Sequence, residues 1–266
     1  MYRLISILIV SWSITTATIL IAAPYSEIVL DAKTGEMLHA ENQDTRLHPA
    51  GLTKLMTLYA AFSAIENGEV SLDDPVLVSQ KAALEPLVKL GLRKQQQIKL
   101  RYLLRAIGIQ GANDASTALA EHIAGSEEAY AKRMQVYSDE IGLTRSSWRN
   151  QHGLTQSQHL STARDIALLF IALERDFPDY FNLFRRRSED AGIRQVANSS
   201  RRILNGITGA IGAKYGYTRA AGFNAATIVE RGGNKIVVVI FGARSSASLV
   251  AMTARLDDVS FKKFSN

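Results

Sequence analysis

The two ends of this chain carry β-strand patterns, and the sequence between them carries helical patterns. Near the start, EIVLD (27–31) and EMLHA (36–40) flank a Lys-Thr-Gly turn, which is a hairpin pattern. Near the end, residues 222–231 and 235–243 read as two strands joined by a Gly-Gly-Asn turn. Strands at both ends with helices between them predict an α/β (α+β) fold, with one antiparallel sheet built from both chain ends.

Six segments have helical character. The first is expected to begin near Pro49, which suits the first position of a helix, and to end at Glu66, before Asn67-Gly68. The other five have helical periodicity and are residues 100–109, 115–124, 128–142, 161–175 and 245–259. With 266 residues and a hydrophobic content of 47%, the chain can build one substantial core but not two large independent domains.

The N-terminus carries an apolar run. Residues 4–23 contain no charged side chain and follow a start that includes Arg3. A short basic segment before an apolar run is the pattern of an export signal, and this run is also long enough to span a bilayer. We therefore expect residues 1–23 to be a signal peptide or an N-terminal membrane anchor. The sequence leaves cleavage or retention open, because Pro24 follows directly and Ile21 is not a small residue.

The composition limits the chemistry of partners and cofactors. The chain has no cysteine, which excludes disulfides and thiolate metal sites. No histidine pair shows metal-ligand spacing, so the histidines are expected to be structural, and neither a metal nor another cofactor is expected. The net charge of +6 allows a solvated basic face or contact with an anionic surface such as lipid or wall polymer. Nothing resembles a nucleic-acid recognition module. The clustered arginines are Arg185, Arg186, Arg187, Arg201 and Arg202.

The stretch HPAGLTKLMT (48–57) raises a chemical question. It places Lys54 near the start of an apolar helix, with Gly51 three residues earlier. A lysine three residues after a serine is a known catalytic arrangement, S-x-x-K. Its spacing puts both side chains on one helical face, where a neutral lysine can take the proton of the hydroxyl. Here the position of the serine holds a glycine.

Two further segments give that lysine a context. They are GANDASTALAEHIAG (111–125) and GAKYGYTRAAGFN (212–224). In order and spacing, the three segments resemble the S-x-x-K, S-x-N and K-T-G boxes of penicillin-recognising enzymes. The most similar family is that of the D-alanyl-D-alanine carboxypeptidases, peptidase family S11, which are low-molecular-mass penicillin-binding proteins. The resemblance spans roughly residues 27–245 and implies a β-lactamase/DD-peptidase-like fold and a role in peptidoglycan metabolism.

The resemblance assigns roles in the first two boxes. Gly51 stands at the position of the nucleophilic serine, so the nucleophile is lost, while Lys54 matches the general base. Gly111 stands where a second serine relays a proton to the departing amine, and this hydroxyl is also lost. Asn113 matches the amide that holds the backbone of the substrate.

The third box implies the substrate-binding positions. Lys214 and Gly216 match the K-T-G pattern, but Tyr215 replaces the threonine that binds the terminal carboxylate, and its bulk is expected to fill that subsite. The oxyanion hole would use the backbone N–H groups of Gly51 and Tyr217, which survive a change of side chain. Thr53 is expected to face away from Lys54, because two helical residues are about 200° apart.

These losses favour a protein without the activity of its family. Loss of a serine nucleophile costs about 10⁶-fold in turnover in a well-studied hydrolase. The retained Lys54, Asn113 and Lys214 indicate either a buried hydrogen-bond network kept for stability or retained ligand binding.

We expect an exported protein, in the periplasm or anchored at the inner membrane, with one DD-peptidase-like domain (24–266) and no second β domain. Its expected partner is a peptidoglycan stem peptide or a cell-wall enzyme. The alternatives are an active D-alanyl-D-alanine carboxypeptidase with a non-standard mechanism and a purely structural partner with a closed cleft.

Overall fold

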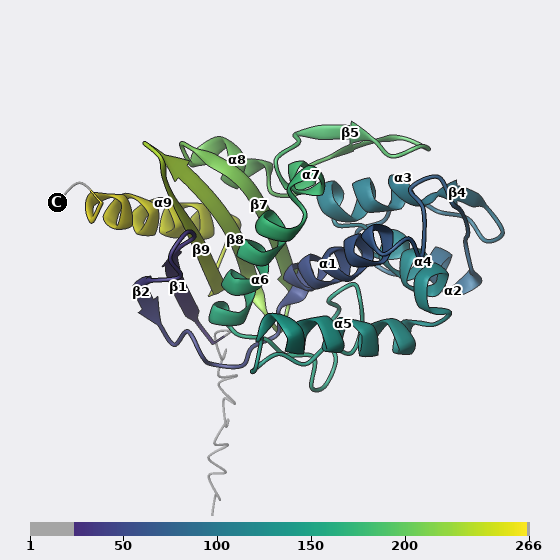
Figure 1. Cartoon of the computed structure of the whole chain (residues 1–266), viewed down its shortest axis with the longest axis horizontal. Coiled ribbons are helices and arrows are strands. Elements are labelled where there is room, and N and C mark those ends of the chain that lie inside the picture. The colour runs from purple at the N-terminus through teal and green to yellow at the C-terminus, as the bar shows by residue number, and fades with distance from the viewer. Residues whose placement is uncertain (1–23, 265–266) are drawn as a thin grey trace, which may run out of the picture.

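The computed structural model describes residues 24–264 and shows a five-stranded antiparallel sheet with helices on both faces (Figure 1). Its strand order is β2-β1-β9-β8-β7, so the first two strands of the chain pair with the last three. The predicted sheet from both chain ends is therefore confirmed. The strands are β1 (Ser26–Asp31), β2 (Met37–Glu41), β7 (Ala210–Thr218), β8 (Gly222–Arg231) and β9 (Asn234–Ala243).

The central strands bury side chains on both faces of the sheet. In β9, Val237 and Val239 belong to the core beneath α6 (Ala163–Asp176), while Ile236 and Val238 belong to the core beneath α9 (Ser246–Lys262). Such a strand reads as a continuous apolar run because neither face meets water. The short helix α8 (Arg201–Gly206) packs beside α9 on the same face.

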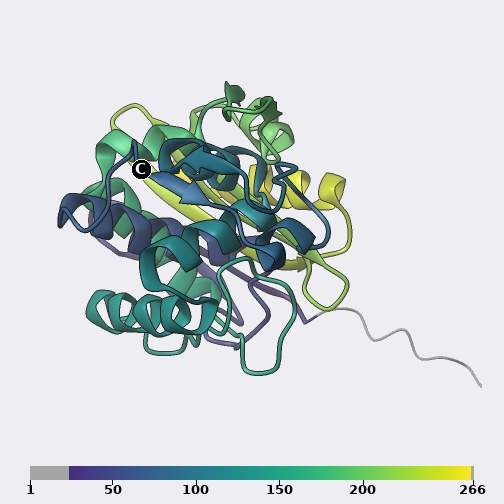
Figure 2. The same cartoon turned by 90° about the vertical axis from the view of Figure 1, so that its right-hand side faces the viewer.

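The remaining helices form a second region beside the sheet (Figures 1 and 2). Its centre is α1 (Thr53–Glu66), whose side chains are almost all buried between the sheet and the other helices. This region also holds two small hairpins, β3–β4 and β5–β6. Its other elements are β3 (Pro75–Leu77), α2 (Gln80–Leu84), β4 (Gln97–Lys99), α3 (Leu100–Arg105), α4 (Asn113–Ala124), α5 (Glu127–Ile141), α7 (Pro178–Phe181), β5 (Ser188–Asp190) and β6 (Gln195–Ala197).

Several predicted elements differ in detail from the observed ones. The helix expected from Pro49 begins as a 3-10 turn, η1 (Ala50–Leu52), and becomes α-helical at Thr53. The helix expected over 100–109 is α3 followed by a π-helix, η2 (Ala106–Gln110). The strand β7 was not predicted, although it carries the third box. The π-helix η2 ends next to Gly111, one of the predicted site positions, and π-helical turns are frequent at functional sites.

The described residues also bear on the expected membrane association. Residues 1–23, on which the predicted signal peptide or anchor falls, lie outside them. Among residues 24–264, no helix has both the length and the apolar character that a bilayer span requires.

Candidate active site

A cleft of about 260 Å³ lies between the edge strand β7, the 3-10 turn η1 and the helical region. It brings together seven of the eight positions predicted from the three boxes, although these boxes are far apart in the sequence. Lys214, the eighth, lies fully buried beside it. The lining residues are Gly51, Lys54, Leu87, Val88, Gln110, Gly111, Asn113, His152, Gly153, Leu154, Ser199, Tyr215, Gly216, Tyr217 and Thr218.

The backbone next to Gly51 is strained. Ala50 has a φ of +49°, a left-handed conformation that few residues other than glycine adopt. Ala50 is also buried, with 1% of its surface exposed. Such strain costs about 1–3 kcal/mol and is found where the surrounding structure fixes a functional geometry. The chain therefore holds a strained turn directly before Gly51.

Gly51 lies directly against the backbone of β7. A β-carbon added to Gly51 would be 2.7 Å from the carbonyl oxygen of Tyr215 and 2.9 Å from Cα of Gly216. Both distances are shorter than van der Waals contact, and both neighbours are backbone atoms, which cannot turn aside as a side chain can. The absence of a side chain at Gly51 is therefore coupled to the position of the whole strand.

Lys54 lies at the base of the cleft, with 3% of its surface exposed. Its Nζ donates hydrogen bonds to Asn113 Oδ1 at 2.8 Å and to the carbonyl oxygen of His152 at 2.6 Å. Burial lowers the pKa of Lys54 to about 7, although the carboxylate of Glu85 opposes this shift. About half of the amine is thus able to accept a proton near pH 7, as a general base must be.

Asn113 joins Lys54 to the opposite wall of the cleft. Its amide Nδ2 donates to the carbonyl oxygen of Pro86 at 2.9 Å, and its backbone N–H donates to the carbonyl oxygen of Val88 at 2.8 Å. These bonds hold the segment 85–88, in which Leu87 has a φ of +65° and is 70% exposed. One amide hydrogen remains for a ligand, because a primary amide has two.

Lys214, from the third box, lies beneath the cleft. It is fully buried, and its Nζ donates to the carbonyl oxygens of Ile107 at 2.5 Å and Gly108 at 2.9 Å, within η2. Burial lowers the pKa of Lys214 well below its usual value. A β-carbon on Gly111 would be 3.9 Å from this Nζ and 3.9 Å from Ser199 Oγ, so there is space for a small side chain, but the φ of +85° would strain any residue other than glycine. Sequence analysis did not single out Ser199, because the segment around it carries no motif.

Tyr215 and Tyr217 lie on the edge strand. The ring of Tyr215 is half-buried and packs toward Phe223, with ring centroids 6.3 Å apart, so Tyr215 approaches Gly51 through its backbone carbonyl. In an antiparallel strand the N–H and C=O of one residue point to the same edge, and every second residue repeats that direction. The N–H of Tyr217 therefore faces the same edge as the carbonyl of Tyr215, toward η1.

Thr53 is buried away from the cleft, as predicted. Its hydroxyl lies 2.8 Å from Nε2 of His159, whose Nδ1 accepts the backbone N–H of Arg149 at 2.9 Å. Because Nδ1 is an acceptor, Nε2 carries the ring proton and donates it to Thr53. Burial lowers the pKa of His159 to about 3. This histidine cannot serve as a base for Thr53, so the pair does not form an activated nucleophile.

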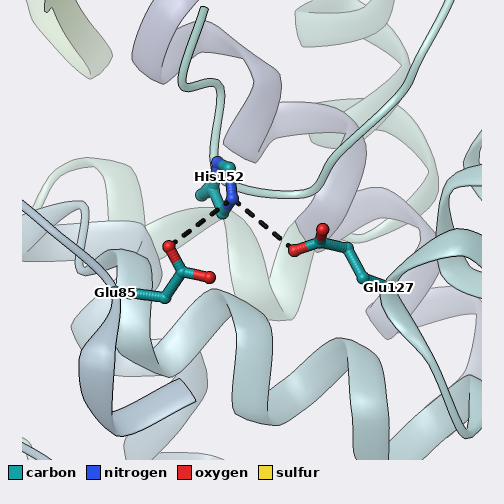
Figure 3. A group of neighbouring side chains, drawn as sticks. All are labelled: Glu85, Glu127 and His152. Carbon is teal, nitrogen blue, oxygen red and sulfur yellow. Dashed lines mark ion pairs between the residues drawn. The ribbon is translucent and has the colours of Figure 1, made fainter. Parts of the chain in front are cut away.

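Sequence reasoning missed a buried cluster behind the cleft, in which His152 lies between two carboxylates (Figure 3). Nε2 of His152 is 3.7 Å from an oxygen of Glu85 and 3.6 Å from an oxygen of Glu127. The imidazole of His152 is the largest influence that lowers the pKa of Glu127, to about 2. Since the backbone carbonyl of His152 accepts a bond from Lys54, this cluster and the cleft share a wall.

The cluster does not fit a metal ion, although its ligand atoms lie within 4.8 Å of one another. A histidine that binds a metal donates its second ring N–H to an acceptor. Here Nδ1 of His152 faces the backbone N–H of Leu154 at 3.1 Å, which is a donor. The proton therefore sits on Nε2, the atom that would have to bind the metal. We conclude that the group is a proton-bearing cluster that orders the cleft wall.

Comparison with known proteins identifies the class. The chain is 30% identical to the D-alanyl-D-alanine carboxypeptidase DacF of Bacillus subtilis over 244 residues, which cover 90% of this chain and 62% of that protein. It is 32% identical to DacC of Escherichia coli over 224 residues, covering 82% of this chain and 56% of DacC. The chain thus spans about 60% of the length of these relatives.

Solved structures of D-alanyl-D-alanine carboxypeptidases and penicillin-binding proteins have the same fold as this chain. The carboxypeptidase DacD of Francisella tularensis superposes with a TM-score of 0.84 at 25% identity, covering 95% of this chain and 73% of that one. Penicillin-binding protein 5 of Haemophilus influenzae gives a TM-score of 0.81 at 26% identity, covering 86% and 68%. The fold is that of penicillin-binding proteins, with a β-lactamase-like arrangement. The family profile of the D-alanyl-D-alanine carboxypeptidases matches residues 14–245, and this chain belongs to that family, peptidase S11.

Proposed function

We propose that this chain is an exported, non-catalytic member of its family that binds the D-Ala-D-Ala end of peptidoglycan stem peptides. The observation that carries the proposal is Gly51: the nucleophile position has no side chain, and backbone atoms of Tyr215 and Gly216 occupy the space where its Cβ would lie. The lost relay hydroxyl at Gly111 supports the same conclusion. The cleft nevertheless persists, and it retains Lys54 and Asn113.

Binding would use the groups that remain. The second amide hydrogen of Asn113 is available to a peptide carbonyl, and the N–H of Tyr217 points toward η1, where an oxyanion donor is expected. Leu87, Val88 and Leu154 supply an apolar wall. A wall enzyme that docks on the same rim is the other candidate partner.

The competing candidate is an active carboxypeptidase with a non-standard mechanism. One observation favours it: the pKa of Lys54 is lowered to about 7, near the value that suits a general base at neutral pH. Two observations count against an active enzyme. Position 51 has no nucleophilic side chain, and the hydroxyl of Thr53 is hydrogen-bonded to His159.

Calorimetry with a pentapeptide that ends in D-Ala-D-Ala separates these candidates, with a peptide of the same composition ending in L-Ala-L-Ala as the control. We expect saturable binding of the D,D peptide alone and no release of D-alanine. Release of D-alanine would support the active enzyme. Absence of binding would contradict the stem-peptide proposal and leave a wall enzyme as the candidate partner.

Export is proposed from the apolar run 4–23 and from membership of this family, with residues 24–266 as the exported domain. A reporter that folds only outside the cytoplasm, fused after Asn266, should be active. A reporter that functions only in the cytoplasm, fused at the same position, should be inactive. N-terminal sequencing of the mature protein then distinguishes a cleaved signal from a retained anchor.

A further inference from the structure

We propose that Lys54 is a covalent binding site for aldehydes, because its amine lines the cleft and keeps one tetrahedral position without a protein partner among the described residues. This inference goes beyond the proposed binding of stem peptides and does not depend on it. It rests on the hydrogen-bond pattern of Nζ, on the open cleft beside it, and on the lost side chain at Gly51.

The hydrogen bonds of Nζ leave room for a neutral amine with a free lone pair. A charged lysine has three N–H donors, whereas a neutral one has two N–H donors and a lone pair. Nζ of Lys54 has two acceptors within the described residues, Asn113 Oδ1 at 2.8 Å and the carbonyl oxygen of His152 at 2.6 Å. Two donors and two acceptors leave the fourth tetrahedral position of the nitrogen, and its lone pair, without a protein partner.

The environment of the Lys54 amine also favours its neutral form. Burial lowers the pKa of Lys54 to about 7, against the opposing carboxylate of Glu85. His152, in the loop that follows α5, presents its backbone carbonyl oxygen to Nζ, and its ring Nδ1 accepts the N–H of Leu154. His159 and Lys214 are also within electrostatic range of Lys54, and burial lowers the pKa of each.

The residues that line the cleft determine which class of aldehyde would bind there. Lys54 and Gly51 both line it, and no hydroxyl stands at position 51 to engage the amine. The surrounding wall includes Leu87, Val88 and Leu154, which would contact an apolar substituent. The ring of Tyr217 is 48% exposed at the cleft rim and extends this apolar surface. We therefore infer a small aldehyde with an apolar or aromatic body.

The chemistry is imine formation. The lone pair of Nζ attacks the carbonyl carbon, the C=O π bond opens, and one nitrogen proton moves through solvent water to the resulting alkoxide, giving a carbinolamine. The hydroxyl then leaves as water, with a proton taken from solvent, and the second nitrogen proton is released as the C=N bond forms. The net reaction is amine plus aldehyde to imine plus water, and it needs no oxidant or reductant.

The test uses benzaldehyde with sodium cyanoborohydride, which reduces the imine to a stable benzylamine. The full chain is treated briefly near neutral pH, and peptide mapping quantifies each lysine. Two lysines of the same chain serve as controls. Lys132 is 76% exposed and pairs with Glu128 on the surface of α5, while Lys214 has a lowered pKa but is fully buried.

We expect Lys54 to be benzylated at least about tenfold faster than Lys132 near pH 7, because about half of Lys54 but only about one in 2,500 ordinary lysines is uncharged there. Lys214 should react more slowly than Lys54, because its amine is buried and out of reach of the aldehyde. This comparison distinguishes the effect of accessibility from the effect of a lowered pKa. The rate at Lys54 should level off above about pH 7, whereas the rate at Lys132 should continue to rise tenfold per pH unit. Equal rates at Lys54 and Lys132 would overturn the proposal.

Asn113→Asp provides a variant that leaves the amine in place. A carboxylate beside Nζ holds its proton and raises the pKa of Lys54. Benzylation of Lys54 should then fall by about tenfold or more near pH 7 and recover near pH 10. Recovery at high pH shows that the variant is folded and the cleft open. An unchanged rate at pH 7 in this variant would contradict the proposal.

Discussion

Gly51 lies so close to the carbonyl oxygen of Tyr215 that a β-carbon on the glycine would be 2.7 Å from it. The missing side chain at position 51 is therefore coupled to the backbone of the neighbouring strand. The edge strand β7 packs so closely against the 3-10 turn η1 that its backbone leaves no room for a β-carbon at this position. Restoring a hydroxyl requires the backbone as well as the side chain to change.

We predict that Gly51→Ser alone does not restore acylation by a fluorescent penicillin. The new Cβ meets Tyr215 O and Gly216 Cα, and such overpacking typically costs about 1–3 kcal/mol of stability. Gly51→Ala is the matched control, because it carries the same β-carbon without a hydroxyl. Both variants should lose similar stability in urea unfolding. Stoichiometric labelling of the serine variant would show that the strand moves easily.

The triple variant Gly51→Ser, Gly111→Ser and Tyr215→Thr should acylate faster than the single variant, and by more than the separate effects multiply. A proton relay at position 111 is worth about 10²–10⁴-fold, and Tyr215→Thr restores the threonine of the K-T-G pattern. Residues that act as one catalytic unit show this non-additivity. If the single variant labels as fast as the triple, Gly111 and Tyr215 have no part in the loss.

The second prediction concerns stability and pH. The pKa of Lys54 is lowered to about 7 in the folded protein by burial. Between about pH 7 and its ordinary value near 10.5, the unfolded chain therefore binds more protons, and the free energy of unfolding rises with pH. One proton contributes at most about 1.4 kcal/mol per pH unit.

Lys54→Met removes this contribution, so the wild-type protein should gain stability relative to the variant as the pH rises through that window. Urea unfolding at several pH values measures the difference. Lys132→Met, at an exposed position, should leave the pH dependence unchanged. A constant difference between wild type and Lys54→Met would show that this lysine stays charged in the folded protein.

A third prediction tests the role of Thr53. Its hydroxyl accepts the ring proton of buried His159, so Thr53→Val leaves a buried N–H without a partner, which costs about 1–3 kcal/mol. Thr53→Ser keeps the acceptor and should lose much less. Neither variant should change the affinity for a stem peptide, since Thr53 does not line the cleft. A large loss of affinity in a folded Thr53→Val variant would assign this residue to the site.

The fold was predictable where local pattern and turn chemistry agree. The hairpins β1–β2 and β8–β9 each place glycine-containing turns between apolar runs, and both formed as expected. β7 was not predicted, because Gly212, Lys214 and Gly216 have little preference for strands. It is a strand because β8 pairs with it, and Gly216 is required there by the close approach to Gly51.

The site was predictable as a set of positions but not as a set of contacts. The resemblance of the three boxes to those of the family implied that Gly51, Lys54, Gly111 and Asn113 share one cleft, and they line it together. The cluster of His152 with two glutamates has no sequence signature, because loops and separate helices bring its members together.

The central claim, that this cleft binds without acylating, is tested most directly by intact-mass measurement of the wild-type chain after incubation with a saturating fluorescent penicillin. Position 51 has no Oγ, and the amine of Lys54 lies at the base of the cleft, bonded to Asn113 and His152. An amine also adds to an amide carbonyl far more slowly than to an aldehyde. The account predicts an unchanged mass and no fluorescent band. A stoichiometric adduct, mapped to any residue from 48 to 57 or to Tyr215, would contradict it.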